Sequence, residues 1–206
     1  MTDSNIEPLL NRYSPISDQI EVAELRVILR ELERICAQDT YGAVVEFGCY
    51  SGTTSLFIRR LLNLLDPIRE FHVYDSFAGL PVKSKEDGSP AGQQFQAGEL
   101  SVSRTNFVNN FKKAGLALPV IHKGWFEALE LIDIPGAVAL AFLDGDFYRS
   151  IKTSLKLVHP RLSVGAKVII DDYQSEALPG VKKAVDEYIT QHPIRLRVEQ
   201  SLAILG

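Results

Sequence analysis

The chain has few of the residues and segments that mark several common protein classes. Its 206 residues include two cysteines, Cys36 and Cys49, which are too few for a disulfide framework or a thiolate zinc site. Both lie among apolar neighbours, where a buried free thiol is expected. No apolar run approaches the length that spans a membrane. Residues 1–5 carry neither a basic region nor an apolar signal core, so we expect a cytoplasmic protein.

Basic residues are not concentrated in any part of the chain. With 22 basic and 26 acidic side chains the formal net charge is −4, and no Lys/Arg cluster is long enough to bind nucleic acid or an anionic membrane. We therefore expect neither nucleic acid nor membrane as a partner. The Gly-x-Ser-x-Gly nucleophile elbow and the Lys-Ser/Thr phosphate-binding loop are also absent from the sequence.

What the chain does contain is a regular alternation of strand and helix patterns, within a length that fits one domain over residues 1–206. Apolar runs predict strands at 43–47, 71–74, 119–122, 137–143, 166–170, 194–198 and 202–205. Three- and four-residue periodicity predicts helices at 21–38, 53–65, 103–114, 148–158 and 181–191. This order is typical of a doubly wound α/β fold, with a mostly parallel seven-stranded sheet and helices on both faces.

Two segments have no such pattern. Residues 1–20, which precede the first helix in an N-terminal region of residues 1–40, are polar and proline-punctuated, with Tyr13 and Ile16 as candidate anchors. The sequence leaves three alternatives for them: a disordered arm, a lid, or a contact in a homodimer. Residues 82–101 are polar with little apolar content, which is typical of a lid loop or a disordered segment.

The stretch from Val44 to Thr54 predicts a strand, a tight turn and a helix. In an open α/β sheet, a nucleotide-like ligand binds where the first strand ends, since backbone N–H groups and a helix N-terminus converge there. Gly48 and Gly52 would let the main chain approach that ligand. Tyr50 stands where the dinucleotide fingerprint has its second glycine, so a nicotinamide or flavin site is disfavoured and a smaller ligand is favoured.

Acidic residues follow three of the predicted strands. Asp75, Asp144 and the Asp171-Asp172 pair should meet at one edge of the sheet, because parallel strands end there together. A lone Asp at a strand end is more often a turn or helix cap, but the Asp144-Gly145-Asp146 and Asp171-Asp172 groups follow neighbouring buried strands and favour function. Oxygen ligands without nearby histidine or cysteine select a hard ion such as Mg²⁺.

Three other positions leave alternatives open. Glu46, an acid within the first apolar strand, either faces a cationic ligand or forms a salt bridge. Trp125 and Phe126 either form an apolar wall for an adenine ring or belong to the core. His122 is either a proton acceptor or a structural histidine.

With these residues assembled, the chain resembles the class I S-adenosylmethionine-dependent methyltransferases and, among them, the macrocin O-methyltransferase family. Five segments carry the resemblance in the family's order, over most of residues 43–190. They are Glu46-Phe47-Gly48-Cys49-Tyr50-Ser51-Gly52-Thr53-Thr54, Tyr74-Asp75-Ser76-Phe77-Ala78-Gly79-Leu80-Pro81, Lys123-Gly124-Trp125-Phe126, Leu143-Asp144-Gly145-Asp146-Phe147-Tyr148-Arg149-Ser150 and Ile169-Ile170-Asp171-Asp172-Tyr173.

The resemblance implies a Rossmann-like fold and roles for the matched positions. S-adenosylmethionine would contact Glu46, Gly48, Tyr50 and Thr54 around its methionine moiety, Asp75 at the ribose, and Ser76 and Trp125 around the adenine. Gly52 and Gly124 complete the cofactor-binding set. Mg²⁺ or another hard divalent cation would bind Asp144, Asp171 and Asp172. The implied reaction is methyl transfer to a metal-bound hydroxyl of a small molecule, a sugar or a secondary metabolite.

The chain also departs from related enzymes. Catechol-type methyltransferases have a lysine three residues after the first metal acid, and Phe147 occupies that place. Asp146, His122 and the metal-bound hydroxyl itself remain candidate bases, and Asp144 belongs to the catalytic set as a metal ligand. The region before the first strand is short and residues 82–101 contain no histidine, so a macrolide sugar is not implied as acceptor. The alternatives are a relative of non-haem metal hydroxylases and a non-catalytic S-adenosylmethionine-binding protein.

Overall fold

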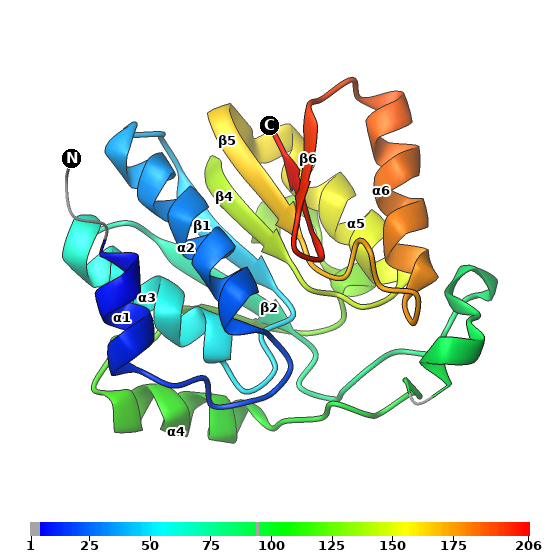
Figure 1. The fold of residues 1–206 in the computed structure, drawn as a ribbon, viewed down its shortest axis with the longest axis horizontal. Coiled ribbons are helices and arrows are strands. Elements are labelled where there is room, and N and C mark those ends of the chain that lie inside the picture. Colours follow the sequence, from blue (N-terminus) through cyan, green and yellow to red (C-terminus); the bar gives the residue numbers. More distant parts are fainter. Residues whose placement is uncertain (1–4, 94) are drawn as a thin grey trace.

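The computed structural model of the chain describes residues 5–93 and 95–206, which are organised around a seven-stranded sheet (Figure 1). The strand order is β3-β2-β1-β4-β5-β7-β6. Strands β1 to β5 are parallel, and β7 runs antiparallel to both of its neighbours. The strands are β1 (Ala43–Phe47), β2 (Phe71–Asp75), β3 (Val120–Lys123), β4 (Val138–Leu143), β5 (Leu162–Ile170), β6 (Leu196–Glu199) and β7 (Leu202–Leu205). The predicted doubly wound, mostly parallel sheet is confirmed.

Helices cover both faces of the sheet, and alternate strand residues enter two separate cores. Val44 of β1 packs in the core on the side of α1, α2, α3 and α4, whereas Val45 and Phe47 pack in the core on the side of α5 and α6. The helices are α1 (Ile6–Arg12), α2 (Val22–Ala37), α3 (Thr53–Leu65), α4 (Arg104–Ala114), α5 (Tyr148–Val158) and α6 (Pro179–Gln191). Short 3₁₀ turns are η1 (Lys85–Asp87), η2 (Pro90–Gly92), η3 (Phe126–Ala128), η4 (Leu131–Asp133) and η5 (His159–Arg161).

Local sequence signals explain where several helices begin and end. A reciprocal capping box between Glu21 and Glu24 starts α2, and the Ser103 hydroxyl accepts a bond from the Asn106 N–H to start α4. Gly115, in the left-handed region at φ +66, ends α4. One strand is longer than predicted: β5 begins at Leu162, and a register shift against β4 lies in this added, partly exposed stretch.

The N-terminal segment is helical in part and packs on the fold. Ile6, Leu9 and Ile20 are buried, so residues 6–12 are not a disordered arm. Tyr13 is an anchor as predicted, with the Arg60 guanidinium 3.8 Å above its ring, whereas the anchor predicted at Ile16 is wrong because that side chain is exposed. The expectation that residues 1–5 do not form a signal sequence concerns mainly residues 1–4, which lie outside the described residues.

Residues 82–101, here called the excursion, leave the end of β2 and extend across to α6 (Figure 1). Backbone bonds close the base of the excursion, from the Leu80 N–H to the Glu99 carbonyl at 2.8 Å and from the Gly98 N–H to the Leu80 carbonyl at 2.9 Å. With two 3₁₀ turns and buried residues in its described part, it is folded rather than disordered. In the described chain, no helix has the length and apolarity to cross a membrane.

Candidate active site

The turn between β1 and α3 brings the backbone to the carboxyl edge of the sheet. Gly48 has φ +85, and a Cβ there would overlap the carbonyl oxygen of Asp144. Gly52, at φ +93, is the N-cap of α3, and its Cβ would come within 2.9 Å of the Phe107 ring. Tyr50 has the left-handed φ of +46 without being a glycine. The turn therefore needs glycine at two positions for space as well as for conformation.

Asp75, at the end of β2, holds this turn in place. Its Oδ2 accepts bonds from the N–H groups of Cys49 at 2.8 Å and Tyr50 at 3.0 Å, and its Oδ1 accepts the Phe77 N–H at 2.7 Å. A carboxylate has about four lone-pair positions, so Asp75 can still accept a ligand hydroxyl. The residue predicted to bind ribose thus also joins β2 to the β1–α3 turn.

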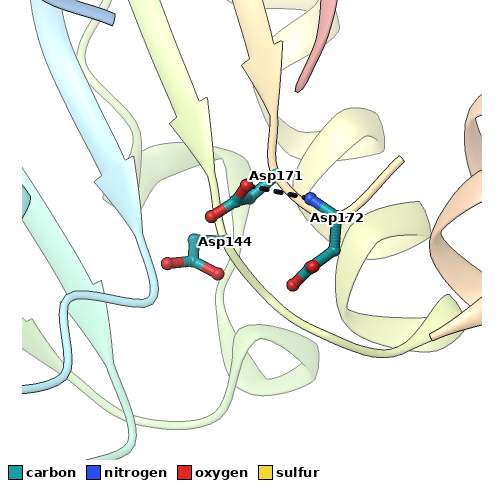
Figure 2. A group of neighbouring side chains, drawn as sticks. All are labelled: Asp144, Asp171 and Asp172. Carbon is teal, nitrogen blue, oxygen red and sulfur yellow. Dashed lines mark hydrogen bonds between the residues drawn. The ribbon is translucent and has the colours of Figure 1, made fainter. Parts of the chain in front are cut away.

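Three carboxylates at the ends of β4 and β5 form a compact group (Figure 2). Asp144, Asp171 and Asp172 each present one oxygen, and these oxygens lie within 4.8 Å of one another. The Asp172 N–H donates to Asp171 Oδ1 at 2.9 Å, which orients the pair. Two oxygens on opposite sides of Mg²⁺ are about 4.2 Å apart, since Mg–O distances are about 2.1 Å. The spacing and the all-oxygen donor set therefore fit a hard divalent cation.

Burial raises the pKa of every acid in this group, and repulsion within the group adds to the shift at Asp144 and Asp171. Burial, followed by the charge of Asp171, holds the pKa of Asp144 well above its usual range. Burial and Asp172 do the same for the pKa of Asp171. Burial raises the pKa of Asp172 to about 6, with a smaller contribution from Glu24. A cation between these groups would relieve the repulsion that keeps them protonated.

Asp146 lies beside this group, and burial followed by the charges of Asp172 and Asp75 raises its pKa to about 7. Its backbone is in the left-handed region at φ +58. The next residue, Phe147, donates its N–H to the Gly145 carbonyl at 2.6 Å and is itself buried. Phe147 cannot accept a proton, so Asp146 is the titratable group that follows Asp144 on this turn.

A cavity of about 240 Å³ connects the glycine turn with the acids. Nine of the predicted site residues line it, and Trp125 among them is 41% exposed. They are Gly48, Tyr50, Asp75, Ser76, Gly124 and Trp125 from the predicted cofactor set, and Asp144, Asp146 and Asp172 from the predicted metal and catalytic sets. Asp171 is behind the wall, 5% exposed. The cavity thus joins the predicted donor and acceptor sides in one space.

Besides Asp171, four predicted site residues do not line the cavity: Glu46, Gly52, Thr54 and His122. Glu46 is 1% exposed and accepts a 2.5 Å bond from the Ser55 hydroxyl, because its side chain points into the core beneath α3. Among the described residues no cation contacts Glu46, so neither alternative predicted for it is observed. Gly52 and Thr54 are buried at the start of α3. Gly52 packs against Phe107 of α4.

His122, the predicted alternative base, also lies elsewhere. Its ring stacks on Tyr74 with centroids 4.3 Å apart, and its Nε2 is 3.0 Å from His72 Nδ1. Burial, with the neighbouring His72, lowers the pKa of His122. It is therefore a neutral member of an aromatic stack at the β2–β3 edge, which leaves Asp146 as the candidate base on the cavity wall.

Other wall residues were not predicted. Asp18 and Gln19 come from the N-terminal segment, Phe95 and Leu100 from the excursion, and Glu127 from η3. No local motif marks these positions, because each reaches the cavity through tertiary packing. Six carboxylates line the cavity, whereas lysine, arginine and histidine are absent from its described wall.

The sequence matches a family model described as Macrocin-O-methyltransferase (TylF) over residues 20–201. It is 33% identical, over 76% of this chain, to 8-demethyl-8-(2,3-dimethoxy-alpha-L-rhamnosyl)-tetracenomycin-C 4'-O-methyltransferase of Streptomyces olivaceus. It is 32% identical, over 82% of this chain, to demethyldecarbamoylnovobiocin O-methyltransferase of Streptomyces niveus. The matched regions span 61% and 66% of the lengths of these two relatives.

A solved structure, that of the O-methyltransferase NovP, has a similar fold. The TM-score is 0.79 at 28% sequence identity, and the superposition covers 91% of this chain and 80% of the other. The similarity in fold therefore extends over most of this chain.

Proposed function

The chain belongs to the macrocin O-methyltransferase family, and we propose that it transfers a methyl group from S-adenosylmethionine to a hydroxyl of a small molecule, assisted by a divalent cation. The observation that carries the proposal is the single cavity in which Gly48, Tyr50 and Asp75 lie with Asp144 and Asp172. Bringing donor and acceptor into one cavity is the main requirement of a direct methyl transfer.

On the donor side, backbone and side chain have separate tasks. The Gly48 turn allows close approach of the cofactor to the main chain, and Asp75, which already accepts three N–H bonds, offers its remaining lone-pair position to a ribose hydroxyl. Trp125, half-exposed on the wall, presents an apolar ring beside Gly124 that suits the adenine.

On the acceptor side, Asp144, Asp171 and Asp172 would hold the cation. When bound, a divalent cation supplies Lewis acidity that favours the deprotonated form of an acceptor hydroxyl. Asp146, which lies on the cavity wall two residues after Asp144, can take the released proton as a general base. Phe147 and Phe126 limit water beneath this turn, because both are buried against it.

The charge of the cavity restricts the acceptor. With six carboxylates and no cationic side chain on its described wall, the cavity repels anions even after a dication and a cofactor with a net charge of about +1 are counted. We propose a neutral or cationic acceptor, a sugar hydroxyl or another hydroxyl of a secondary metabolite. The names of the two relatives, which mention a rhamnosyl tetracenomycin and demethyldecarbamoylnovobiocin, support this class.

The test combines cofactor binding with turnover. Calorimetry should detect S-adenosylhomocysteine binding, and mass spectrometry should detect a 14-Da increase in glycosylated acceptors when S-adenosylmethionine and Mg²⁺ are present. Asp144→Asn should keep cofactor binding and lose turnover, while Glu70→Gln, at an exposed side chain just before β2 and away from the carboxyl edge of the sheet, should keep both. Turnover by Asp144→Asn at the wild-type rate would contradict the proposed metal role, and absence of cofactor binding would contradict the proposed function.

The alternatives make different predictions. A non-haem hydroxylase needs two histidines beside a carboxylate, and histidine is absent from the three-acid group and from the described cavity wall. A non-catalytic relative would bind S-adenosylhomocysteine without methylating any acceptor. The turnover assay separates this case from the enzyme.

A further inference from the structure

A buried carboxylate connects the excursion to α5. Asp87, on η1, is 1% exposed. Its Oδ2 accepts bonds from the N–H and the hydroxyl of Ser84, at 2.8 and 2.6 Å, and so closes the η1 turn. Its Oδ1 accepts the N–H of Tyr148, the first residue of α5, at 2.7 Å. The N-cap residue of α5, Phe147, has no side-chain acceptor, so Asp87 supplies one from a distant part of the chain.

The same carboxylate fits against α6. A Cβ at Gly180 would overlap Asp87 Oδ1 and would lie within 2.9 Å of the Tyr148 backbone nitrogen. Glycine is therefore the residue that allows η1, α5 and α6 to meet. Farther along the excursion, the Ser89 hydroxyl donates to the Glu176 carbonyl at 2.7 Å, in the loop before α6.

These contacts lie next to the acidic turns of the proposed active site. Helix α5 begins directly after the Asp144–Phe147 turn, and α6 follows the loop that begins at Asp171 and Asp172. The excursion also contributes Phe95 and Leu100 to the cavity wall. Asp87 thus links the excursion, which supplies Phe95 and Leu100 to the wall, to the start of the helix that follows the Asp144–Phe147 turn.

We propose that Asp87 is a positioning residue, which keeps the Phe95 and Leu100 wall closed over the cavity and in register with Asp144 and Asp146. The proposal rests on the proposed function, because it assigns the excursion to the wall of the methyl-transfer cavity. Asp87 contacts neither the cofactor side nor the acids directly. It acts through the first turn of α5 and through the η1 turn.

Three variants and one control separate this role from general stability. Asp87→Ala removes both acceptors, and Asp87→Asn retains one of them. Gly180→Ala displaces the carboxylate while leaving it in the chain, and alanine is the better helix former, so α6 is preserved. Lys85→Ala changes the same η1 turn at a side chain that is 91% exposed, and serves as the control.

Two measurements report on the opening of the Phe95 and Leu100 wall. Amide hydrogen exchange reports local opening, and the fluorescence of Trp125, the one tryptophan in the chain, follows the dissociation of S-adenosylhomocysteine. In Asp87→Ala and Gly180→Ala we expect exchange about tenfold faster in residues 95–100 and 148–151, with β1 and β4 unchanged. Dissociation should also be about tenfold faster, while the Kd changes less than about twofold because association accelerates equally. Asp87→Asn should be intermediate.

Two results would overturn the proposal. One is wild-type exchange and dissociation rates in both Asp87→Ala and Gly180→Ala. The other is faster exchange throughout the sheet, including β1, which would make Asp87 a residue of general stability only. A wild-type protein that binds no S-adenosylhomocysteine would contradict the proposed function, and the exchange of residues 95–100 would still decide whether Asp87 holds the wall.

Discussion

Glu46 is a carboxyl group enclosed in the core, and its replacement by glutamine should show that the native state keeps it protonated. Burial raises its pKa from 4.5 to about 8, the Ser55 hydrogen bond opposes this shift, and the charge of Asp75 adds to it. The folded state therefore retains a proton that the unfolded state releases between these two values. Stability from this group is fully present below pH 4.5 and is lost as the pH rises through about 8.

The size of the effect follows from the two pKa values. Proton binding is linked to folding, and the pKa of Glu46 is 4.5 in the unfolded chain and about 8 in the folded protein. Glu46 should therefore contribute about 3 kcal/mol more to the free energy of unfolding at about pH 5.5 than at about pH 9. For a domain of this length that difference corresponds to roughly 6–12 °C in the unfolding midpoint. Glu46→Gln keeps the acceptor for Ser55, has the shape of the protonated acid and does not titrate.

The assay compares urea unfolding of the wild type and Glu46→Gln at several pH values between about 5.5 and about 9, in metal-free buffer. The acids of the cavity titrate in both proteins, so the difference between the two isolates Glu46. The wild type should lose about 3 kcal/mol more than the variant over this range. Parallel pH profiles would refute the argument, since they would mean that Glu46 ionises inside the fold at no extra cost.

Three further predictions concern the cavity. Gly48→Ala should cost more than about 2 kcal/mol of unfolding free energy and abolish S-adenosylhomocysteine binding, whereas Gly98→Ala, with φ +86 but open space around it, should cost only about 1 kcal/mol. The second prediction concerns Mg²⁺ or Mn²⁺ at pH 8, which is above the pKa of about 6 of Asp172. At about a hundred times its Kd, the cation should raise the free energy of unfolding of the wild type by about 2.7 kcal/mol. An equal rise in Asp144→Asn would contradict the three-acid site. Of two acceptors that differ only by a phosphate, the phosphorylated one should be methylated at least about tenfold more slowly, and equal rates would show that the acidic wall does not select charge.

The carboxyl edge could be predicted from the sequence because topology alone decides where parallel strands end. Once the apolar runs before Asp75, Asp144 and Asp171 are assigned to neighbouring parallel strands, their acids must meet at one edge. The direction of Glu46 was also within reach of the sequence. Val45 and Phe47 alternate with it, so it must point to the opposite face, under α3, rather than out of the strand end.

The excursion and its contacts could not be predicted in this way. Asp87 lies in a polar stretch that has the composition of a loop, and its partner Tyr148 is 61 positions away. Asp18 likewise reaches the cavity only because α1 and the following residues pack on α2 and α3. Hydrophobic periodicity describes which face of an element is buried, but a single polar contact between two distant turns leaves no periodic signal.

Backbone conformation gives a last physical reason to place function at this edge. In the described chain, four of the seven non-glycine residues with positive φ line the cavity: Tyr50, Leu100, Asp146 and Asp172. Each such residue costs on the order of 1 kcal/mol or more, and it persists only where the surrounding contacts determine it. Asp75 accepts a bond from the Tyr50 N–H, and Asp171 accepts one from the Asp172 N–H, so the acids themselves hold two of these four conformations. The strained turns and the carboxylates are therefore one preorganised unit, and a substitution that relaxes the backbone will also move the acids.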